Sequence, residues 1–191
     1  MCMDEKPMEK EIKCTIEALY HCLTHFESLD DASMTALLNA GYTNEHINEQ
    51  LAKPGSKFYS DFGTSPLEII KKLRQECPET MMNIPEPDSL GRIRLSFVLN
   101  EVIGNDGVIE TGALTEEELS TMQTESRNGC MIRKVRTSRV VLTKECQAVL
   151  AVGKEAYYII TLYPGTQAPP LPKAGETNSF WDNHCFIEYE K

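Results

Sequence analysis

Residues 156–162, AYYIITL, are the most strongly β-forming stretch of the chain, because β-branched and aromatic side chains dominate them. Upstream, residues 92–102 (RIRLSFVLNEV) begin with an alternation of polar and apolar side chains, which predicts another strand. One or two strands are predicted within residues 130–142 (CMIRKVRTSRVVL), and a further one within residues 147–152. Strands that follow one another without long helices between them pair as antiparallel neighbours, so this half of the chain predicts a small antiparallel sheet.

One short helix is expected to pack on this sheet. Thr115 can cap it, and residues 116–125 (EEELSTMQTE) would form it, with acidic side chains in the first turn. This interpretation places Glu125 at the end of the helix. A proline-rich surface loop is expected over residues 164–175, and residues 179–190 (SFWDNHCFIEYE) predict the last strand.

The first half of the chain is predicted to be helical. Apolar side chains recur at three- and four-residue steps in residues 8–28, which predicts a first helix there. Capping residues and prolines delimit three shorter helices, over residues 32–39, 44–52 and 67–77. Pro85 and Pro87 mark a linker. The predicted fold is therefore α+β: an N-terminal small helical bundle (residues 1–82), followed by a C-terminal antiparallel β-sheet with a short packed helix (residues 88–191).

The charge of the chain is acidic and uneven. The 191 residues carry 19 Lys and Arg against 29 Asp and Glu, a formal net charge of −10 at pH 7. A uniformly acidic surface would repel nucleic acid. Residues 1–87 hold much of the excess, with 15 acidic and 8 basic side chains, whereas residues 126–144 hold six basic side chains and no acidic one. A protein partner for the acidic half and an anion site in the basic stretch are therefore both open.

Several classes of site are not expected. The seven cysteines are odd in number and widely spaced, without a CxxC pair, which argues against a disulfide framework or a structural zinc site. His21 and His25 lie four residues apart on the predicted first helix, and we interpret them as solvated histidines of a helix face. No cofactor motif, secretion signal or membrane-spanning apolar run is recognisable, so we expect a cytoplasmic protein with no cofactor, no metal and no membrane contact.

Polar residues of the second half have the chemistry for metal-independent RNA cleavage. This reaction needs a base for the 2′-hydroxyl proton, an acid for the leaving 5′-oxygen and cationic donors for the charge that develops on the phosphate. The candidates for these catalytic roles are Glu125, Arg136, Arg139 and His184. The candidates for contacts to the phosphate or a base are Arg133, Ser138, Thr161 and Tyr163.

Residues 92–191 resemble the barnase-like microbial ribonucleases and the wider group of colicin-type small nuclease toxins. The resemblance rests on the order of Glu125, the Arg136–Arg139 segment and His184. Residues 161–164 (TLYP) are also similar to the T-x-[YF]-P strand end of some of these toxins. The resemblance implies a core of a helix and a four-stranded sheet, with RNA as the substrate.

Two functions are therefore open from the sequence, and whether the protein is an enzyme is open with them. One is a ribonuclease, or an RNA- or phosphate-binding toxin-like domain. The other is a non-enzymatic protein-interaction module, whose acidic helical half binds a protein partner. The oligomeric state is open in both.

Overall fold

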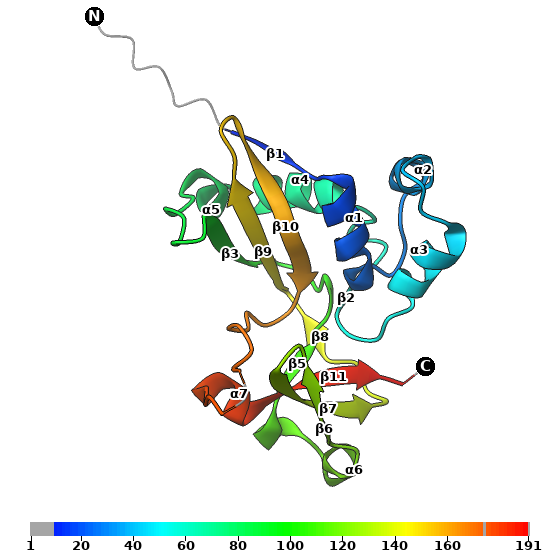
Figure 1. Cartoon of the computed structure of the whole chain (residues 1–191), viewed down its shortest axis with the longest axis vertical. Helices are drawn as coiled ribbons and strands as arrows, with labels where there is room; N and C mark the ends of the chain where they lie inside the picture. Colours follow the sequence, from blue (N-terminus) through cyan, green and yellow to red (C-terminus); the bar gives the residue numbers. More distant parts are fainter. Residues whose placement is uncertain (1–9, 174, 191) are drawn as a thin grey trace, which may run out of the picture.

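The computed structural model describes residues 10–173 and 175–190 and has a mixed α+β fold (Figure 1). Its first sheet, which we call the upper sheet, contains β1 (Glu11–Lys13), β10 (Ala156–Pro164), β9 (Glu145–Val152) and β3 (Arg92–Val98), in that order. β9 is antiparallel to both of its neighbours, and β1 is parallel to β10. The three longer strands confirm the predictions for these segments.

Helices cover one face of the upper sheet. α1 (Ile16–Cys22), α4 (Pro66–Glu76) and α5 (Pro78–Met82) contribute to this core, and Figure 1 shows α4 and α5 behind β9 and β10. Every second side chain of β3 is buried against them, because successive strand side chains point to opposite faces. The core therefore combines side chains from both sides of the predicted linker. The division of the chain into two domains stays a prediction.

A second small core lies beside α1. There α2 (Asp31–Asn39), α3 (Asn44–Leu51) and the 3₁₀ turn η1 (Leu23–His25) meet around Leu19, Leu23, Leu37 and Ile47. The helices predicted in this region and at residues 67–77 are confirmed. Each begins where a capping side chain accepts a hydrogen bond from the first turn, namely Asp30, Thr43 and Ser65.

The second large sheet, which we call the lower sheet, contains β5 (Val108–Glu110), β11 (His184–Tyr189), β7 (Cys130–Thr137) and β6 (Gln123–Arg127), in that order. β11 is parallel to β7, and the other two pairs are antiparallel. The core of this sheet is formed by Ile109, Val135, Cys185 and Ile187. The parallel pairs β11–β7 and β1–β10 join segments that are distant in the chain, and the sequence predicted neither.

Short elements connect and flank the two large sheets. A third sheet of β2 (Lys57–Phe58), β4 (Gly104–Asn105) and β8 (Leu142–Thr143) lies between them. α6 (Glu116–Ser120) follows the 3₁₀ turn η2 (Thr111–Ala113), and α7 (Ser179–Asn183) precedes β11. The prediction of strand throughout residues 179–190 is thus wrong for α7, because the Asn178 side chain accepts hydrogen bonds from the first N–H groups of this segment and starts a helix.

The prediction of one helix over residues 8–28 is confirmed only for Ile16–Cys22 and is wrong for the rest of the described range; residues 8 and 9 lie outside the described residues. Residues 11–13 form the edge strand β1, in which Ile12 is buried in the core of the upper sheet. α1 begins only after Thr15, whose hydroxyl accepts a hydrogen bond from the Ala18 N–H. A capping residue in the middle of an apolar pattern makes the helix begin at that point, so the residues before it are not part of the helix.

The helix predicted over residues 116–125 ends at Ser120. Glu125 lies instead on β6, opposite Ile132 of β7. A tight turn joins these two strands, in which Asn128 and Gly129 have φ angles of 50° and 76°. Such angles are typical of the two-residue turns that close β-hairpins, so the turn overrides the helical preference of the preceding residues.

Three further expectations concern membranes, disulfides and metals. Among the described residues, no helix is long and apolar enough to cross a membrane. All cysteines in this part of the chain are free thiols, and Cys2 lies outside it. Residues 10–173 and 175–190 also contain no group of three His, Cys, Asp or Glu side chains placed to hold a metal ion.

Candidate functional site

The predicted catalytic residue Glu125 is engaged in ion pairs on the lower sheet. Its carboxylate lies 2.8 Å from the Arg127 guanidinium and 2.9 Å from Lys134 Nζ. Hydrogen bonds from Lys134 and Arg127 hold the pKa of Glu125 below its ordinary value. Lys134 also pairs with Glu188 at 3.0 Å, and Arg136 Nε lies 3.7 Å from Glu188. Glu125 and Arg136 therefore belong to one chain of alternating charges.

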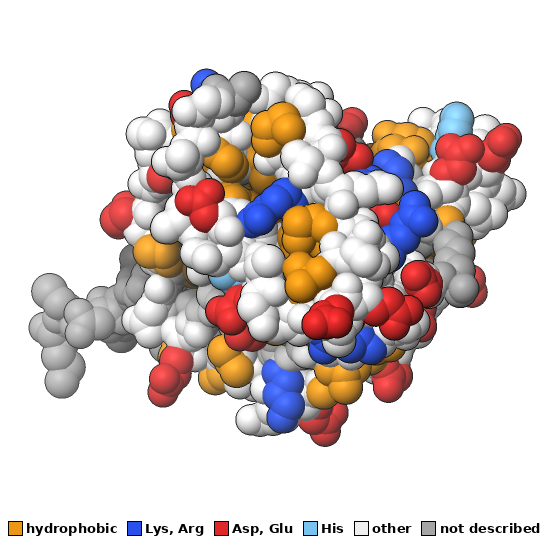
Figure 2. All heavy atoms as spheres, turned by 90° about the horizontal axis from the view of Figure 1, so that it is seen from below, with side chains coloured by type: hydrophobic (Ala, Val, Ile, Leu, Met, Phe, Trp, Pro, Cys, Tyr) orange, Lys and Arg blue, Asp and Glu red, His pale blue; other side chains and the backbone are white. Residues whose placement is uncertain are grey.

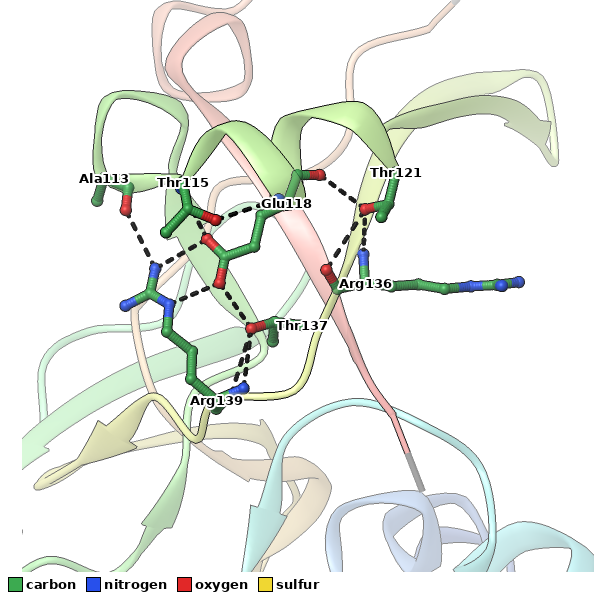
Figure 3. A network of polar contacts seen from close by, with 7 residues as sticks. All are labelled: Ala113, Thr115, Glu118, Thr121, Arg136, Thr137 and Arg139. Atoms are coloured by element: carbon green, nitrogen blue, oxygen red, sulfur yellow. Dashed lines mark hydrogen bonds and ion pairs between the residues drawn. The ribbon is translucent and has the colours of Figure 1, made fainter.

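Arg139 belongs to a different network, centred on the buried carboxylate of Glu118 (Figure 3). Its Nε and Nη2 donate to the two carboxylate oxygens over 2.6 and 3.1 Å. The Thr137 hydroxyl and the Thr115 N–H donate to the same carboxylate. These bonds, that of Arg139 first, lower the pKa of Glu118 to about 2. Figure 3 shows the Arg136 side chain pointing away from this group, so the two predicted arginines do not meet.

His184 is held by a third set of contacts. Its ring stacks on Phe180 with centroids 3.8 Å apart, and Nδ1 donates to the Phe180 carbonyl over 2.7 Å. Nε2 lies 4.0 Å from Glu110. Arg133 donates from Nη2 to three backbone carbonyls at the end of α7 and the start of β11, including that of His184. Both side chains therefore fix the junction between α7 and β11.

These contacts do not bring the predicted catalytic residues together. Within the described residues, no hydrogen bond or ion pair joins His184 to Glu125, Arg136 or Arg139. Figure 2, which shows the molecule from the side of the lower sheet, shows acidic and basic side chains mixed with small hydrophobic patches rather than a continuous basic surface. Ser138 borders a separate small hollow of about 220 Å³. The convergence of these residues on one phosphate stays a prediction without support from contacts.

A cleft of about 860 Å³ lies elsewhere, between the upper and lower sheets. Thr161 and Tyr163 of β10 line it, as two of the predicted substrate contacts. His25 of η1 and Ser56 border it from the helical side. Its charged lining residues from the α3–β2 loop and the lower sheet are Lys53, Arg127, Lys134 and Glu188.

His25 is the titratable side chain that the cleft perturbs most. Its Nδ1 lies 2.9 Å from the Ser56 hydroxyl and 3.4 Å from the Ser56 carbonyl, and its ring centroid is 5.6 Å from that of Tyr163. Burial, with smaller contributions from Lys57 and His21, lowers the pKa of His25 to about 4. The imidazole is therefore neutral near pH 7. The contact with the carbonyl, which only accepts, favours hydrogen on Nδ1 and leaves Nε2 as a proton acceptor.

The interpretation of His25 as a solvated helix-face residue is wrong. α1 ends at Cys22, and the 3₁₀ turn that follows turns His25 into the cleft, where it is half-buried, while His21 stays exposed on the helix. The i, i+4 spacing in the sequence described a helix that does not extend that far. The helical spacing continues through Leu23 and Phe26, both fully buried, so the sequence carried no signal for this turn.

A β-bulge gives Thr161 and Tyr163 their position in the cleft. Ile159 pairs with Leu150 and Thr161 with Val149, so Ile160 is an extra residue in β10. Without it, Thr161 would share the face of Ile159, which is buried against the helices. The bulge shifts the alternation by one residue and turns both hydroxyl-bearing side chains to the open face. Bulges commonly re-aim side chains beside functional sites.

Asp106 fixes the proline-rich wall of the cleft. Its carboxylate accepts hydrogen bonds from the Thr166 hydroxyl at 2.6 Å, the Thr166 N–H at 3.1 Å and the Val108 N–H at 3.1 Å. Gly165 has φ +113°, and a Cβ there would lie 2.4 Å from Asp106 Oδ1. Only glycine therefore allows the chain to turn this close to the carboxylate. The loop after β10 is tied to the start of the lower sheet at this point.

Comparison with known proteins does not identify the chain. It matches no protein-family model, and no curated protein is significantly similar to it.

Proposed function

We propose that the cleft binds an RNA strand and cleaves it by general acid–base catalysis, with His25 as the base. The observation that carries this proposal is a neutral imidazole, oriented by Ser56 and facing Tyr163, in a cleft large enough for a nucleotide. This site replaces Glu125 and His184, which are engaged in contacts of their own, but keeps the predicted Thr161 and Tyr163. The predicted reaction type is unchanged.

The perturbed pKa of His25 suits a base. A histidine with a pKa near 4 is unprotonated throughout the neutral range and is ready to accept a proton. A bound phosphate would place negative charge beside the ring and favour the imidazolium that forms during the reaction. Lys53 on the cleft border supplies positive charge for the phosphate and for the charge that develops on it.

The reaction balances with the groups present. The 2′-oxygen of the RNA attacks the adjacent phosphorus while His25 takes its proton, and the bond from phosphorus to the 5′-oxygen breaks. Burial raises the pKa of Tyr163, so its hydroxyl is protonated and can give a proton to the departing oxygen. The products are a 2′,3′-cyclic phosphate and a 5′-hydroxyl. The proton on His25 then returns to Tyr163 through water, which restores both groups.

The test is cleavage of a labelled RNA oligonucleotide by the whole protein between about pH 5 and 8. We expect 2′,3′-cyclic phosphate ends from the wild type. The cleavage rate of His25→Gln should be at least about 100-fold lower, since general-base catalysis contributes roughly 10²–10⁴-fold. His184→Ala is the matched control and should keep the rate within about twofold.

Two results would contradict the proposal. One is the absence of wild-type cleavage over this pH range. The other is a folded His25→Gln variant, with an unchanged thermal midpoint, that cleaves as fast as the wild type. If His184→Ala instead abolished cleavage, the constellation predicted from the sequence would be the site.

A non-enzymatic interaction module is the second candidate. The observation that favours it is that Glu125, Arg136 and Arg139 all form ion pairs within the protein, as structural residues do. The acidic excess of residues 1–87 fits a basic protein partner for the helical half. A wild-type protein that neither cleaves nor binds RNA would favour this function.

A further inference from the structure

The face of the upper sheet that the helices leave uncovered carries an aligned set of polar and aromatic side chains. Arg92 and Arg94 of β3 are exposed there, because the residues between and after them turn to the core. On the same face, cross-strand pairing aligns Arg94 with Val149 and Thr161, and Arg92 with Ala151 and Tyr158. The bulge in β10 is what brings Tyr158 and Thr161 to one face.

The two arginines differ from four of the six basic residues in residues 126–144. Arg127, Lys134, Arg136 and Arg139 are ion-paired with carboxylates. Within residues 10–173 and 175–190, no ion pair or hydrogen bond involves the guanidinium group of Arg92 or Arg94. A charge without a partner in the protein can bind a ligand without first breaking an internal contact.

The face leads directly into the cleft. Thr161 and Tyr163 belong to both, and Arg94 is close enough to Tyr163 for its charge to favour the phenolate. Arg92 and Arg94 are two residues apart on a strand, about 6.6 Å along it, which is a spacing that suits consecutive phosphates of an extended strand. Tyr158 has 37 % of its surface exposed, so its ring can stack on a base.

Acidic groups also border this face. The Asp88 carboxylate lies near both arginines and accepts hydrogen bonds from the N–H groups of Leu90 and Arg92. Glu145 stands at the other end, opposite Val98. The arginines therefore provide a local positive stretch with acidic ends on an otherwise acidic protein. Such a stretch is complementary to a single polyanion strand rather than to a broad anionic surface.

We propose that this open face is a binding track for single-stranded RNA, which guides the strand into the cleft. That the strand continues into the cleft rests on the proposed function. Arg92 and Arg94 bind phosphates, and Tyr158 stacks on a base. The occupant is a single strand because the track is one sheet face with an aromatic platform, and unstacked bases are needed to use it.

The test uses binding to a 12-nucleotide 2′-O-methyl RNA, which cannot form the cyclic phosphate, followed by fluorescence anisotropy with the full chain. We expect the double variant Arg92→Gln/Arg94→Gln to raise Kd about tenfold and to reduce the slope of log K against log salt by about 1.4, since each phosphate contact on a single strand contributes about 0.7. Tyr158→Ala should also raise Kd, by about tenfold. Arg136→Gln is the matched control, since Arg136 is also exposed but lies on the lower sheet, and should leave Kd within about twofold.

The outcomes separate this inference from the proposed function. If the track variants lose binding but the wild type cleaves no RNA, the track stands and the nuclease proposal fails. If His25 is needed for cleavage but the track variants bind the 12-mer as tightly as the wild type, the track is refuted. It is also refuted if a polyglutamate peptide of equal charge binds as tightly and Tyr158→Ala has no effect, because the face would then select only charge. Thermal midpoints of the variants should match the wild type, since all three side chains are at the surface.

Discussion

Glu118→Gln is expected to destabilise the protein near pH 7, because this substitution removes the charge that four hydrogen bonds surround. The pKa of Glu118 is about 2 in the folded protein against an ordinary 4.5. At about 1.4 kcal/mol per pKa unit, the full difference corresponds to roughly 3 kcal/mol. Arg139, its main partner, has 46 % of its side chain exposed, so solvent screening reduces this value. We expect a loss of roughly 1–3 kcal/mol in the free energy of unfolding.

The pH dependence has a definite sign. The folded state holds Glu118 ionised down to about pH 2, whereas the unfolded state protonates it near pH 4.5. The stabilisation is therefore complete above about pH 4.5 and is lost as the pH falls toward 2. Wild type and Glu118→Gln should differ most near pH 7, should differ by about half as much or less at pH 3, and should converge only near pH 2.

Urea unfolding of both proteins at pH 7 and pH 3 measures this difference. Glu116→Gln, an exposed acid of the same helix, is the control and should change stability by less than about 0.5 kcal/mol. The reasoning is refuted if Glu118→Gln is as stable as the wild type at pH 7. It is refuted equally if the destabilisation is the same at both pH values, because the charge would then not be its source.

Three further predictions concern the cleft and the lower sheet. The imidazole of His25 should titrate near pH 4 by NMR, and a titration near 6.5 would contradict its burial. Because its folded pKa lies below the ordinary 6.5, His25 should contribute to a loss of stability as the pH falls from about 6.5 to 4. Gly165→Ala should lower stability by about 1–3 kcal/mol and speed proteolysis of the following loop, because a Cβ would collide with Asp106; unchanged proteolysis would show that this contact does not hold the loop. Arg133→Ala should lower stability by about 1–3 kcal/mol by leaving the carbonyls at the end of α7 without a donor, yet leave RNA affinity unchanged; a loss of affinity at unchanged stability would restore Arg133 as a substrate contact.

Local signals predicted the fold where local interactions decide it. The caps Asp30, Thr43 and Ser65 and the alternation in residues 92–98 gave the positions of three helices and a strand. The sequence failed where distant pairing decides. β1 has three residues, and its strand conformation follows from pairing with β10, which is more than a hundred residues away. Segments this short adopt the structure that the neighbouring element provides.

The same limit applies to the candidate site. Thr161 and Tyr163 were recognised because they end the strongest strand, and this property is local. His25 was missed because its position depends on where α1 ends and on how the following turn packs against Tyr163. The bulge at Ile160 left no mark in the sequence, since β-branched residues surround it on both sides. Simple alternation from Ile159 would place Thr161 on the buried face, and only the register of β10 with β9 shows that it lies on the other.

The basic residues show why a dense charge cluster in a sequence is a poor guide to an anion site. Residues 126–144 were predicted to hold an anion site because they contain six cations and no acid. Most of these cations form ion pairs with carboxylates from other segments, such as Glu118 and Glu188. Each such pair satisfies the charge that a ligand would need, and releasing it costs part of the stability of the lower sheet. Arg92 and Arg94 are only two cations in an ordinary strand. The fold places them on a face where Asp88 lies near them, but among the described residues no carboxylate forms an ion pair with their guanidinium groups. Whether a cation is free to bind a ligand depends on the tertiary structure, and this distinguishes Arg92 and Arg94 from the cations of residues 126–144. For this reason we propose that the polyanion binds the upper sheet and not the basic stretch.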